Sequence, residues 1–89
     1  MKIKENFVLR QVADIWVVLP LSSATLNFDG MLNLNESGAM LWNQLEQGAS
    51  REQLADVLIS EYAISREIAL NDVDEFIHNL LEAGCLDMQ

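Results

Sequence analysis

Three short stretches near the start of the sequence have the hydrophobic pattern of β-strands. Residues 7–12 alternate between apolar and polar positions, residues 15–20 are a continuous run of β-forming residues, and residues 30–34 alternate again. Alternation with a period of two is the pattern of a half-buried strand. Only Ala13 and Asp14 separate the first two stretches, which is the length of a tight hairpin loop. The pattern predicts a three-stranded antiparallel sheet.

The spacing changes after residue 34, where apolar residues begin to recur at intervals of three and four. This is the period of an amphipathic helix, and it predicts helices at residues 36–46, 51–62 and 66–83. The predicted fold class is therefore α+β and winged helix-turn-helix-like, with the sheet followed by three helices. At 89 residues the chain is long enough for one modest core, so we expect a single domain spanning residues 1–89.

Capping residues set the boundaries of these helices. Asn35, Ser50 and Ser65 precede the three helices, and each can accept a hydrogen bond from an otherwise unpaired backbone N–H group. Gly48 and Gly84 follow the first and third helices, where glycine commonly ends a helix. The start of every helix is thus predicted from a specific side chain.

The third predicted helix carries more apolar surface than one core-facing stripe requires. At about 100° per residue its apolar positions span roughly 140°, against roughly 100° for a single stripe. The surplus edge consists of Leu70, Ile77 and Leu81, with Asp74 just beyond it. From composition alone, packing on the sheet or under the N-terminal segment is the simpler explanation of this edge. A binding surface is the alternative.

Charge is distributed unevenly along the chain. Residues 1–34 hold equal numbers of basic and acidic side chains, so the formal net charge of −9 lies entirely on residues 35–89. Such an acidic surface repels a phosphate backbone, because nucleic-acid affinity comes largely from Lys and Arg. We expect no nucleic-acid partner. Solubility explains the acidity most simply, and a basic partner is the alternative.

Neither a membrane nor an oxidising compartment is indicated by the sequence. The apolar runs are too short to cross a bilayer, and the N-terminus lacks the apolar core of a signal peptide. We therefore expect a cytoplasmic protein with no membrane partner. Cys85 is the single cysteine, which excludes an internal disulfide and a multi-thiolate metal site, and we expect it to pack as a small hydrophobic residue.

Catalytic chemistry has little support in the sequence. His78, the single histidine, points away from the apolar arc of its helix and is expected to face solvent. Asp72, Asp74 and Glu75 cluster in sequence, but residues two apart on a helix do not face each other, so we interpret them as a solvated face. The nucleophile-elbow, Walker, dinucleotide-binding and zinc-ligand patterns are all absent from the sequence. We expect no enzymatic activity, no cofactor and no metal.

Two other classes of small binding module fit poorly. An acyl carrier protein needs a serine in an Asp-Ser-Leu setting at a helix start, and no serine here has that setting. A winged-helix DNA-binding domain would place its third helix in the major groove, but this helix carries five acidic residues against Arg66 alone. A winged-helix transcriptional or scaffolding domain that binds a protein partner stays open as an alternative.

The order and spacing of capping and core residues resemble those of the PqqD-like proteins, whose fold is also called the RiPP recognition element. The resemblance covers nearly the whole chain, through "VVLP", "LNLNESGAMLWNQLEQGASREQLADVLISEYAIS" and "DVDEFIHNLLEAGCL". The matching positions are Leu34, Asn35, Gly38, Leu41, Trp42, Leu45, Gly48, Ser50, Leu54, Leu58, Tyr62, Asp72, Val73, Phe76, Ile77, Leu80, Gly84 and Leu86.

The resemblance implies a non-catalytic domain that binds the leader segment of a ribosomally synthesised precursor peptide and presents it to a modifying enzyme, often a radical-SAM protein. In the family the leader lies between the third strand and the third helix and joins the sheet as an extra antiparallel strand. Because the sequence ends soon after Gly84, we expect the enzyme, a radical-SAM protein or another maturase, to be a separate chain.

Applied to this chain, the resemblance and the surplus apolar arc together predict the peptide-binding residues. Main-chain pairing is assigned to Met31, Leu32 and Asn33. The side-chain pocket is assigned to Leu70, Val73, Asp74, Ile77 and Leu81. Phe76 and Asn79, on the opposite edge of the helix, are the alternative lining. The family pattern fixes the helix, whereas the choice of edge rests on the arc.

Overall fold

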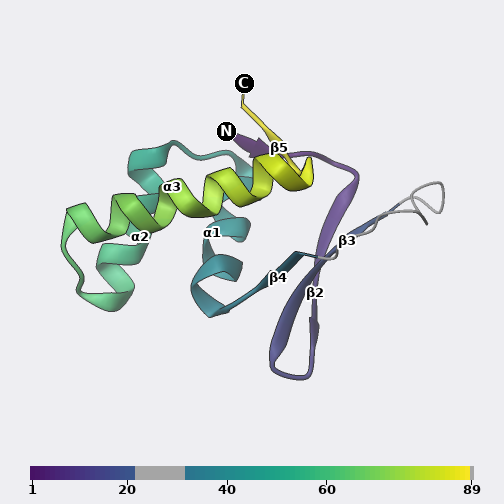
Figure 1. Ribbon diagram of the computed structural model, residues 1–89, viewed down its shortest axis with the longest axis horizontal. Coiled ribbons are helices and arrows are strands. Elements are labelled where there is room, and N and C mark those ends of the chain that lie inside the picture. Colours follow the sequence, from purple (N-terminus) through teal and green to yellow (C-terminus); the bar gives the residue numbers. More distant parts are fainter. Residues whose placement is uncertain (22–31, 89) are drawn as a thin grey trace.

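The computed structural model describes residues 1–21 and 32–88, and it contains the three predicted strands and three predicted helices in the predicted order, with a further short strand near each end (Figure 1). They are β1 (Lys2–Ile3), β2 (Phe7–Val12), β3 (Ile15–Pro20), β4 (Leu32–Leu34), α1 (Glu36–Gln47), α2 (Arg51–Tyr62), α3 (Arg66–Ala83) and β5 (Leu86–Asp87). Helices α2 and α3 have the predicted bounds, and α1 ends one residue later than predicted. The first two residues of the strand predicted at 30–34 lie outside the described residues.

Strands β2, β3 and β4 form the predicted antiparallel sheet in that order. Val17, near the middle of β3, is opposite Arg10 of β2 on one side and Asn33 of β4 on the other. The two-residue loop between β2 and β3 places Ala13 at φ +56°, a left-handed conformation that such tight hairpin loops require. Within the described part of the chain, β4 is an edge strand.

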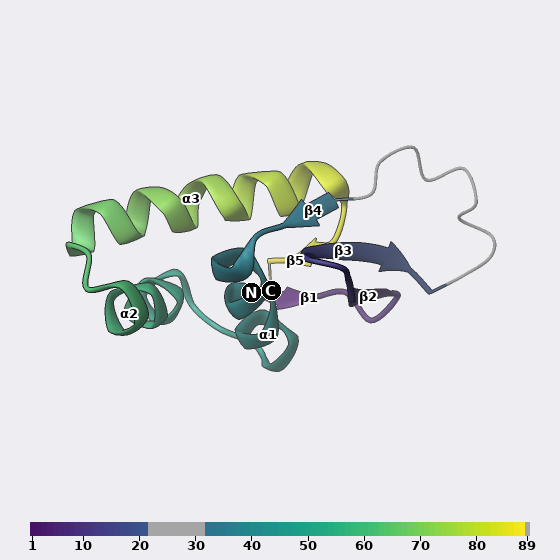
Figure 2. The same cartoon turned by 90° about the horizontal axis from the view of Figure 1, so that it is seen from below.

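A second sheet was not predicted from the sequence. β1 pairs antiparallel with β5, so that Ile3 lies opposite Leu86, and the backbone N–H of Lys4 donates to the carbonyl of Cys85 at 2.9 Å. The prediction of three strands is therefore corrected to five among the described residues. The two ends of the described chain lie side by side as a result (Figure 2). Strands of two residues show no periodicity that a sequence pattern can detect.

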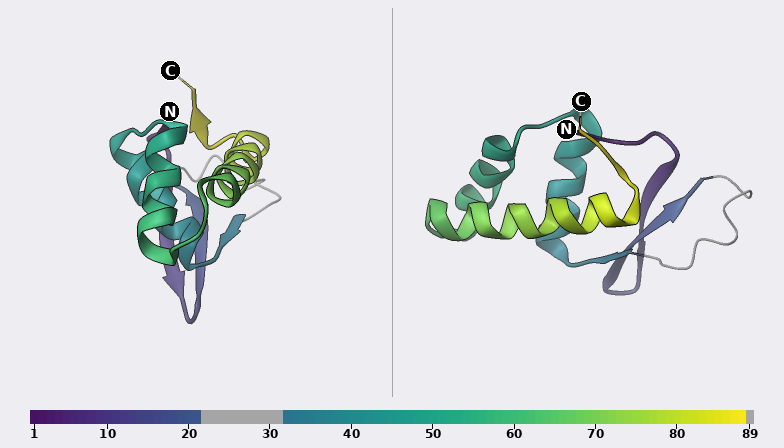
Figure 3. Two further views of the ribbon diagram at one scale, coloured as in Figure 1. Left: turned by 90° about the vertical axis from the view of Figure 1, so that its left-hand side faces the viewer. Right: turned by 45° about the horizontal axis from the view of Figure 1, so that its top comes forward.

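The hydrophobic core lies where the three helices meet the sheet. Trp42 of α1, Leu54 of α2, Leu80 of α3 and Val18 of β3 are all fully buried. Figure 3 shows α3 lying along one side of the molecule with β4 beside it. None of the helices in the described residues combines the length and the hydrophobicity that crossing a membrane would require.

The junction between β4 and α1 is tightly built. The Asn35 side chain accepts hydrogen bonds from the backbone N–H of Gly38 at 2.9 Å and from the Ser37 hydroxyl at 2.9 Å, as its predicted capping role requires. A Cβ atom at Gly38 would lie 3.2 Å from the Cβ of Leu34. Glycine at this position therefore lets the strand turn directly into the helix, which holds β4 in place.

Candidate functional site: the cleft between β4 and α3

The hydrogen-bond alternation of the sheet determines which backbone groups of β4 are available to a partner. In an antiparallel pair, hydrogen-bonded and non-hydrogen-bonded residue pairs alternate. The N–H of Leu21 donates to the carbonyl of Asn6 at 2.8 Å, so these two residues form a hydrogen-bonded pair. Every second pair along the register is then hydrogen-bonded as well, and the pair of Arg10 and Val17 is one of these. The backbone groups of Val17 therefore point towards β2 and away from β4.

The same alternation then directs the backbone of β4. Trp16 and Val18, the neighbours of Val17, point their backbone groups towards Leu34 and Leu32, their partners in β4. The N–H and C=O of Asn33, which lies between these two leucines, point to the opposite side. No strand of the described residues pairs there, so Asn33 presents one donor and one acceptor at the sheet edge.

A cleft of about 330 Å³ lies along this edge, between β4 and α3. Leu41 and Leu58, both buried in the core, contribute apolar surface to it. The β4–α1 side is lined by Asn33, Leu34, Asn35, Ser37 and Gly38. The α3 side is lined by Asp72, Glu75, Phe76 and Asn79. An open strand edge and an apolar floor thus occur together, with polar groups around them.

The cleft continues into a second cavity of about 390 Å³ near the turn between α2 and α3. Asn35, Ser37, Leu58 and Asp72 line both cavities, which are therefore contiguous. The second cavity adds the side chains of Tyr62 and Ile64 and the carboxylate of Glu36 to the shared lining residues. An extended segment lying on β4 could continue along this groove past the start of α1.

The structure places the predicted site residues on different sides of α3. Asn33 lines the cleft, and so do Phe76 and Asn79, which the sequence analysis gave as the alternative edge. Met31 lies outside the described residues. Leu32, which was assigned to main-chain pairing, points its backbone groups towards Val18 of β3 and away from the open edge, and its side chain is half-buried against the core.

The edge of α3 that the sequence analysis preferred does not line the cleft. Val73 is fully buried in the core, and Leu70 and Ile77 are half-buried against it. Leu81 is 43% exposed, but it is not part of the cleft wall. The surplus apolar arc is thus explained by core packing for most of its length. The choice of edge from the arc stays a prediction, and the lining of the cleft favours the alternative edge with Phe76 and Asn79.

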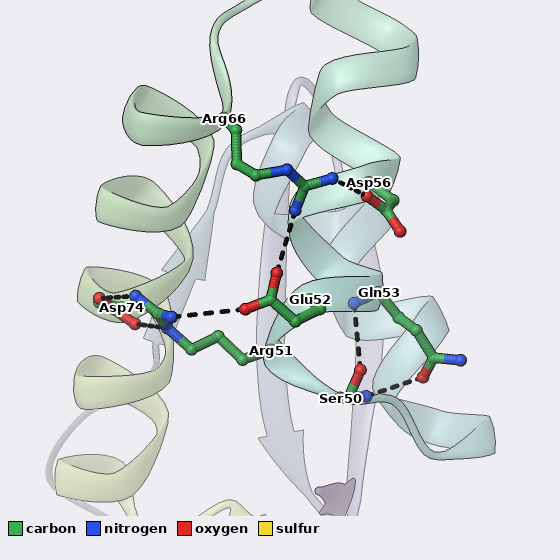
Figure 4. Close-up of polar contacts among 7 residues, drawn as sticks. All are labelled: Ser50, Arg51, Glu52, Gln53, Asp56, Arg66 and Asp74. Atoms are coloured by element: carbon green, nitrogen blue, oxygen red, sulfur yellow. Dashed lines mark hydrogen bonds and ion pairs between the residues drawn. The ribbon is translucent and has the colours of Figure 1, made fainter.

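Asp74 also lies away from the cleft, because it is paired with Arg51 at the start of α2 (Figure 4). The Arg51 Nε donates to Asp74 Oδ1 at 2.6 Å and the Nη2 donates to Oδ2 at 2.8 Å. The bidentate contact lowers the pKa of Asp74 and raises the pKa of Arg51. This side of α3 therefore faces α2 and is not the side next to β4.

Two acidic residues of the cleft wall were assigned to a solvated face by the sequence analysis. Asp72 and Glu75 share one face of α3 with Phe76 and Asn79, at the three- and four-residue intervals that bring helical residues together. The spacing was visible in the sequence, but it does not indicate which face lies next to β4. The other lining residues that were not predicted as site residues are Leu34, Asn35, Ser37, Gly38, Leu41 and Leu58.

The titratable side chains outside the cleft give no sign of a catalytic centre in the described residues. His78 is exposed and its Nε2 lies 3.1 Å from Glu82 Oε1. Cys85 is buried in the core, and this burial raises the pKa of its thiol, while nearby Lys4 has the opposite, smaller effect. No group of three potential metal ligands occurs among residues 1–21 and 32–88.

Comparison with known proteins identifies the family. Residues 16–86 match the family described as coenzyme PQQ synthesis protein D (PqqD). The chain belongs to the PqqD family. Its fold is similar to that of two solved structures. The first, TbiB1 in complex with the TbiA(beta) leader peptide, is 26% identical with a TM-score of 0.78, covering 100% of this chain and 98% of that chain.

The second similar structure is a lasso peptide synthetase B1 complexed with the leader peptide. It is 25% identical with a TM-score of 0.73, and the match covers 94% of this PqqD-family chain and 93% of that chain. No curated protein matches the sequence. Both similar structures thus span nearly the same length as this chain, and both contain a leader peptide.

Proposed function

We propose that this PqqD-family chain binds the leader segment of a ribosomally synthesised precursor peptide and presents it to a separate modifying enzyme. The leader adds to the sheet as an extra antiparallel strand at the edge of β4. One observation carries the proposal: the N–H and C=O of Asn33 point out of the sheet into a cleft with an apolar floor. Folded proteins normally protect such an edge, and strand addition is a common way to use one.

The similar structures support this proposal. Both are complexes with leader peptides, and this chain matches them over nearly its full length. The proposed role is non-catalytic, since it consists of holding the precursor while another protein modifies it. We propose a cytoplasmic setting, where the precursor is synthesised, and a radical-SAM protein or another maturase as the enzyme.

Both the backbone and the side chains of the leader contribute to the proposed binding. Main-chain hydrogen bonds to Asn33 supply affinity that is independent of sequence, and pockets for alternate side chains supply specificity. A leader that orders on binding loses about 2–5 kcal/mol to that ordering. A few buried anchors must offset this loss, and the apolar surface of Leu41, Leu58 and Phe76 is the place for them.

A winged-helix domain that binds DNA is not favoured by the geometry. Its recognition helix would be α3, whose wall next to β4 carries Asp72 and Glu75. Arg66, the basic residue of this helix, is bound to Glu52 and Asp56 of α2 at 3.0 and 2.5 Å. The charge on this surface opposes contact with a phosphate backbone.

An amide NMR titration tests the proposal. The labelled protein is titrated with the N-terminal half of a short peptide encoded beside its gene, and separately with duplex DNA. We expect the peptide alone to shift amides of β4 and of the α3 face that carries Asp72, Phe76 and Asn79. No response to the peptide combined with shifts caused by DNA would contradict the proposal.

A further inference from the structure

We propose that the leader recognised by this cleft carries a Lys or Arg that pairs with Asp72 and Glu75, and an apolar residue two positions away that enters the cleft. This inference rests on the proposed function and specifies which side chains the same site accepts. The open edge of β4 and the cleft define where the peptide lies. The two carboxylates determine the charge of the residue beside them.

Among the described residues, no Lys or Arg side chain pairs with the cleft carboxylates of Asp72 and Glu75. All five Lys and Arg side chains belong to the described residues, and residues 22–31 contain no Lys, Arg or His. None of the five lines either cavity. Asp72 borders both cavities and Glu75 borders the first. Within the described chain neither residue forms an ion pair, and the segment outside it has no cation to offer.

The acidic residues at the contact between α2 and α3, in contrast, are paired with arginines. Arg51 pairs with Asp74 at 2.6 Å and lies 3.6 Å from Glu52. Arg66 pairs with Glu52 and Asp56, and Figure 4 shows that both arginines lie in this one network. The two arginines of the acidic half are thus committed to the α2–α3 contact. Asp72 and Glu75, on the side that the peptide covers, have no such arginine partner among the described residues.

Covering these carboxylates with a peptide makes the charge of the peptide important. A strand laid between β4 and α3 removes water from Asp72 and Glu75, and an ionised group that loses water without a partner costs free energy. A Lys or Arg of the leader offsets this cost, whereas an Asp or Glu adds like-charge repulsion. The cleft therefore discriminates against acidic segments at this position.

The spacing of the two carboxylates suits a single cation. Three residues along an α-helix correspond to about 4.5 Å of rise, while residues two apart on a strand are separated by about 6.8 Å. One Lys or Arg side chain therefore reaches both Asp72 and Glu75, and the planar guanidinium of Arg can donate to both. Side chains two residues apart on a strand point to the same face, so the leader residue two positions before or after this cation points to the apolar surface formed by Leu58 and Phe76.

Selection from a display library of random twelve-residue peptides tests the inference. Three proteins are compared: the wild type, a cleft variant with Asp72→Lys and Glu75→Lys, and a control variant with Glu46→Lys and Glu67→Lys. The last has the same net charge as the cleft variant, but Glu46 and Glu67 are exposed and line neither cavity. We expect wild type and control to enrich peptides with Lys or Arg two positions from an apolar residue, and the cleft variant to enrich Asp or Glu instead.

A second measurement does not depend on the variants. Replacing the Lys or Arg of a peptide selected by the wild type with Glu is expected to weaken its binding to the wild type about tenfold or more. Selected peptides with no excess of Lys and Arg, or an unchanged affinity after this replacement, would overturn the inference while leaving strand addition intact. The absence of any enriched peptide would overturn the proposed function and the inference together.

Discussion

Arg51 and Asp74 are joined by two hydrogen bonds of 2.6 and 2.8 Å that connect the start of α2 to the middle of α3. This contact lies on the side of α3 away from the cleft, and the opposite side, with Phe76 and Asn79, is the one next to β4. The pair therefore identifies which face of the helix is available to a peptide.

Asn79→Lys should weaken leader binding by about tenfold or more, since it places a long charged side chain in the cleft, and tenfold corresponds to about 1.4 kcal/mol. Asp74→Lys introduces the same side chain on the same helix, but outside the cleft, and should change the affinity less than about twofold. Isothermal titration calorimetry with one leader peptide measures both. The reverse ranking would restore the edge formed by Leu70, Asp74 and Ile77 as the binding surface.

Asn33→Pro should leave the fold intact and weaken leader binding. Proline removes the backbone N–H, which at this position is not used in pairing with β3, and proline is tolerated on an edge strand for that reason. The loss of one hydrogen bond costs about 0.5–1.5 kcal/mol, or roughly two- to tenfold in affinity. Asn33→Ala is the matched control, because it changes the side chain and keeps the N–H. Equal affinities of the two variants would argue against a main-chain bond at residue 33.

The Arg51–Asp74 pair should contribute to stability in a pH-dependent manner. Because the pair lowers the pKa of Asp74 from its usual value of 3.8, the folded state gains stability at pH values above 3.8 and loses this gain as the pH falls through the lowered pKa. Both side chains are about half exposed, so the effect is small and weakened by salt. Urea unfolding of wild type and Asp74→Asn between pH 7 and pH 3 measures it. A stability difference that grows towards low pH would be inconsistent with this sign.

Cys85 should react with a thiol reagent only when the β1–β5 end of the molecule opens. Its side chain is fully buried, and burial raises the pKa of the thiol, so at neutral pH the group is protonated and inaccessible. We expect the labelling rate to rise with urea in step with unfolding. Fast labelling of the native protein would show that the contact between Lys4 and Cys85 opens readily.

The helices were predictable because each has local signals at its ends. The side chains of Asn35, Ser50 and Ser65 each accept the N–H bond expected of an N-cap, and Gly48 and Gly84 follow α1 and α3. Such signals are read within a few residues of one another. The three-stranded sheet was predictable for a similar reason, since alternation and a two-residue loop define β2 and β3 locally.

The features that the sequence did not reveal depend on contacts between distant residues. Ile3 and Leu86 pair across nearly the whole chain, and two-residue strands carry no pattern of their own. The face of α3 next to β4 depends on the packing of α2 against α3, including the bond between Arg51 and Asp74, which are 23 residues apart. A helical wheel shows that α3 has two edges flanking the core stripe, but it does not show which neighbour each edge meets.

The amide hydrogen-exchange rate of Asn33 tests the central claim most directly. It is measured by NMR in the free protein and at saturation with a leader peptide. We predict that the Asn33 amide slows by about tenfold or more on binding, because it gains a hydrogen bond worth roughly 1.4 kcal/mol, and that it slows more than the amides of Leu32 and Leu34, which already face β3. An Asn33 amide that exchanges at the same rate in the saturated complex would contradict strand addition at β4.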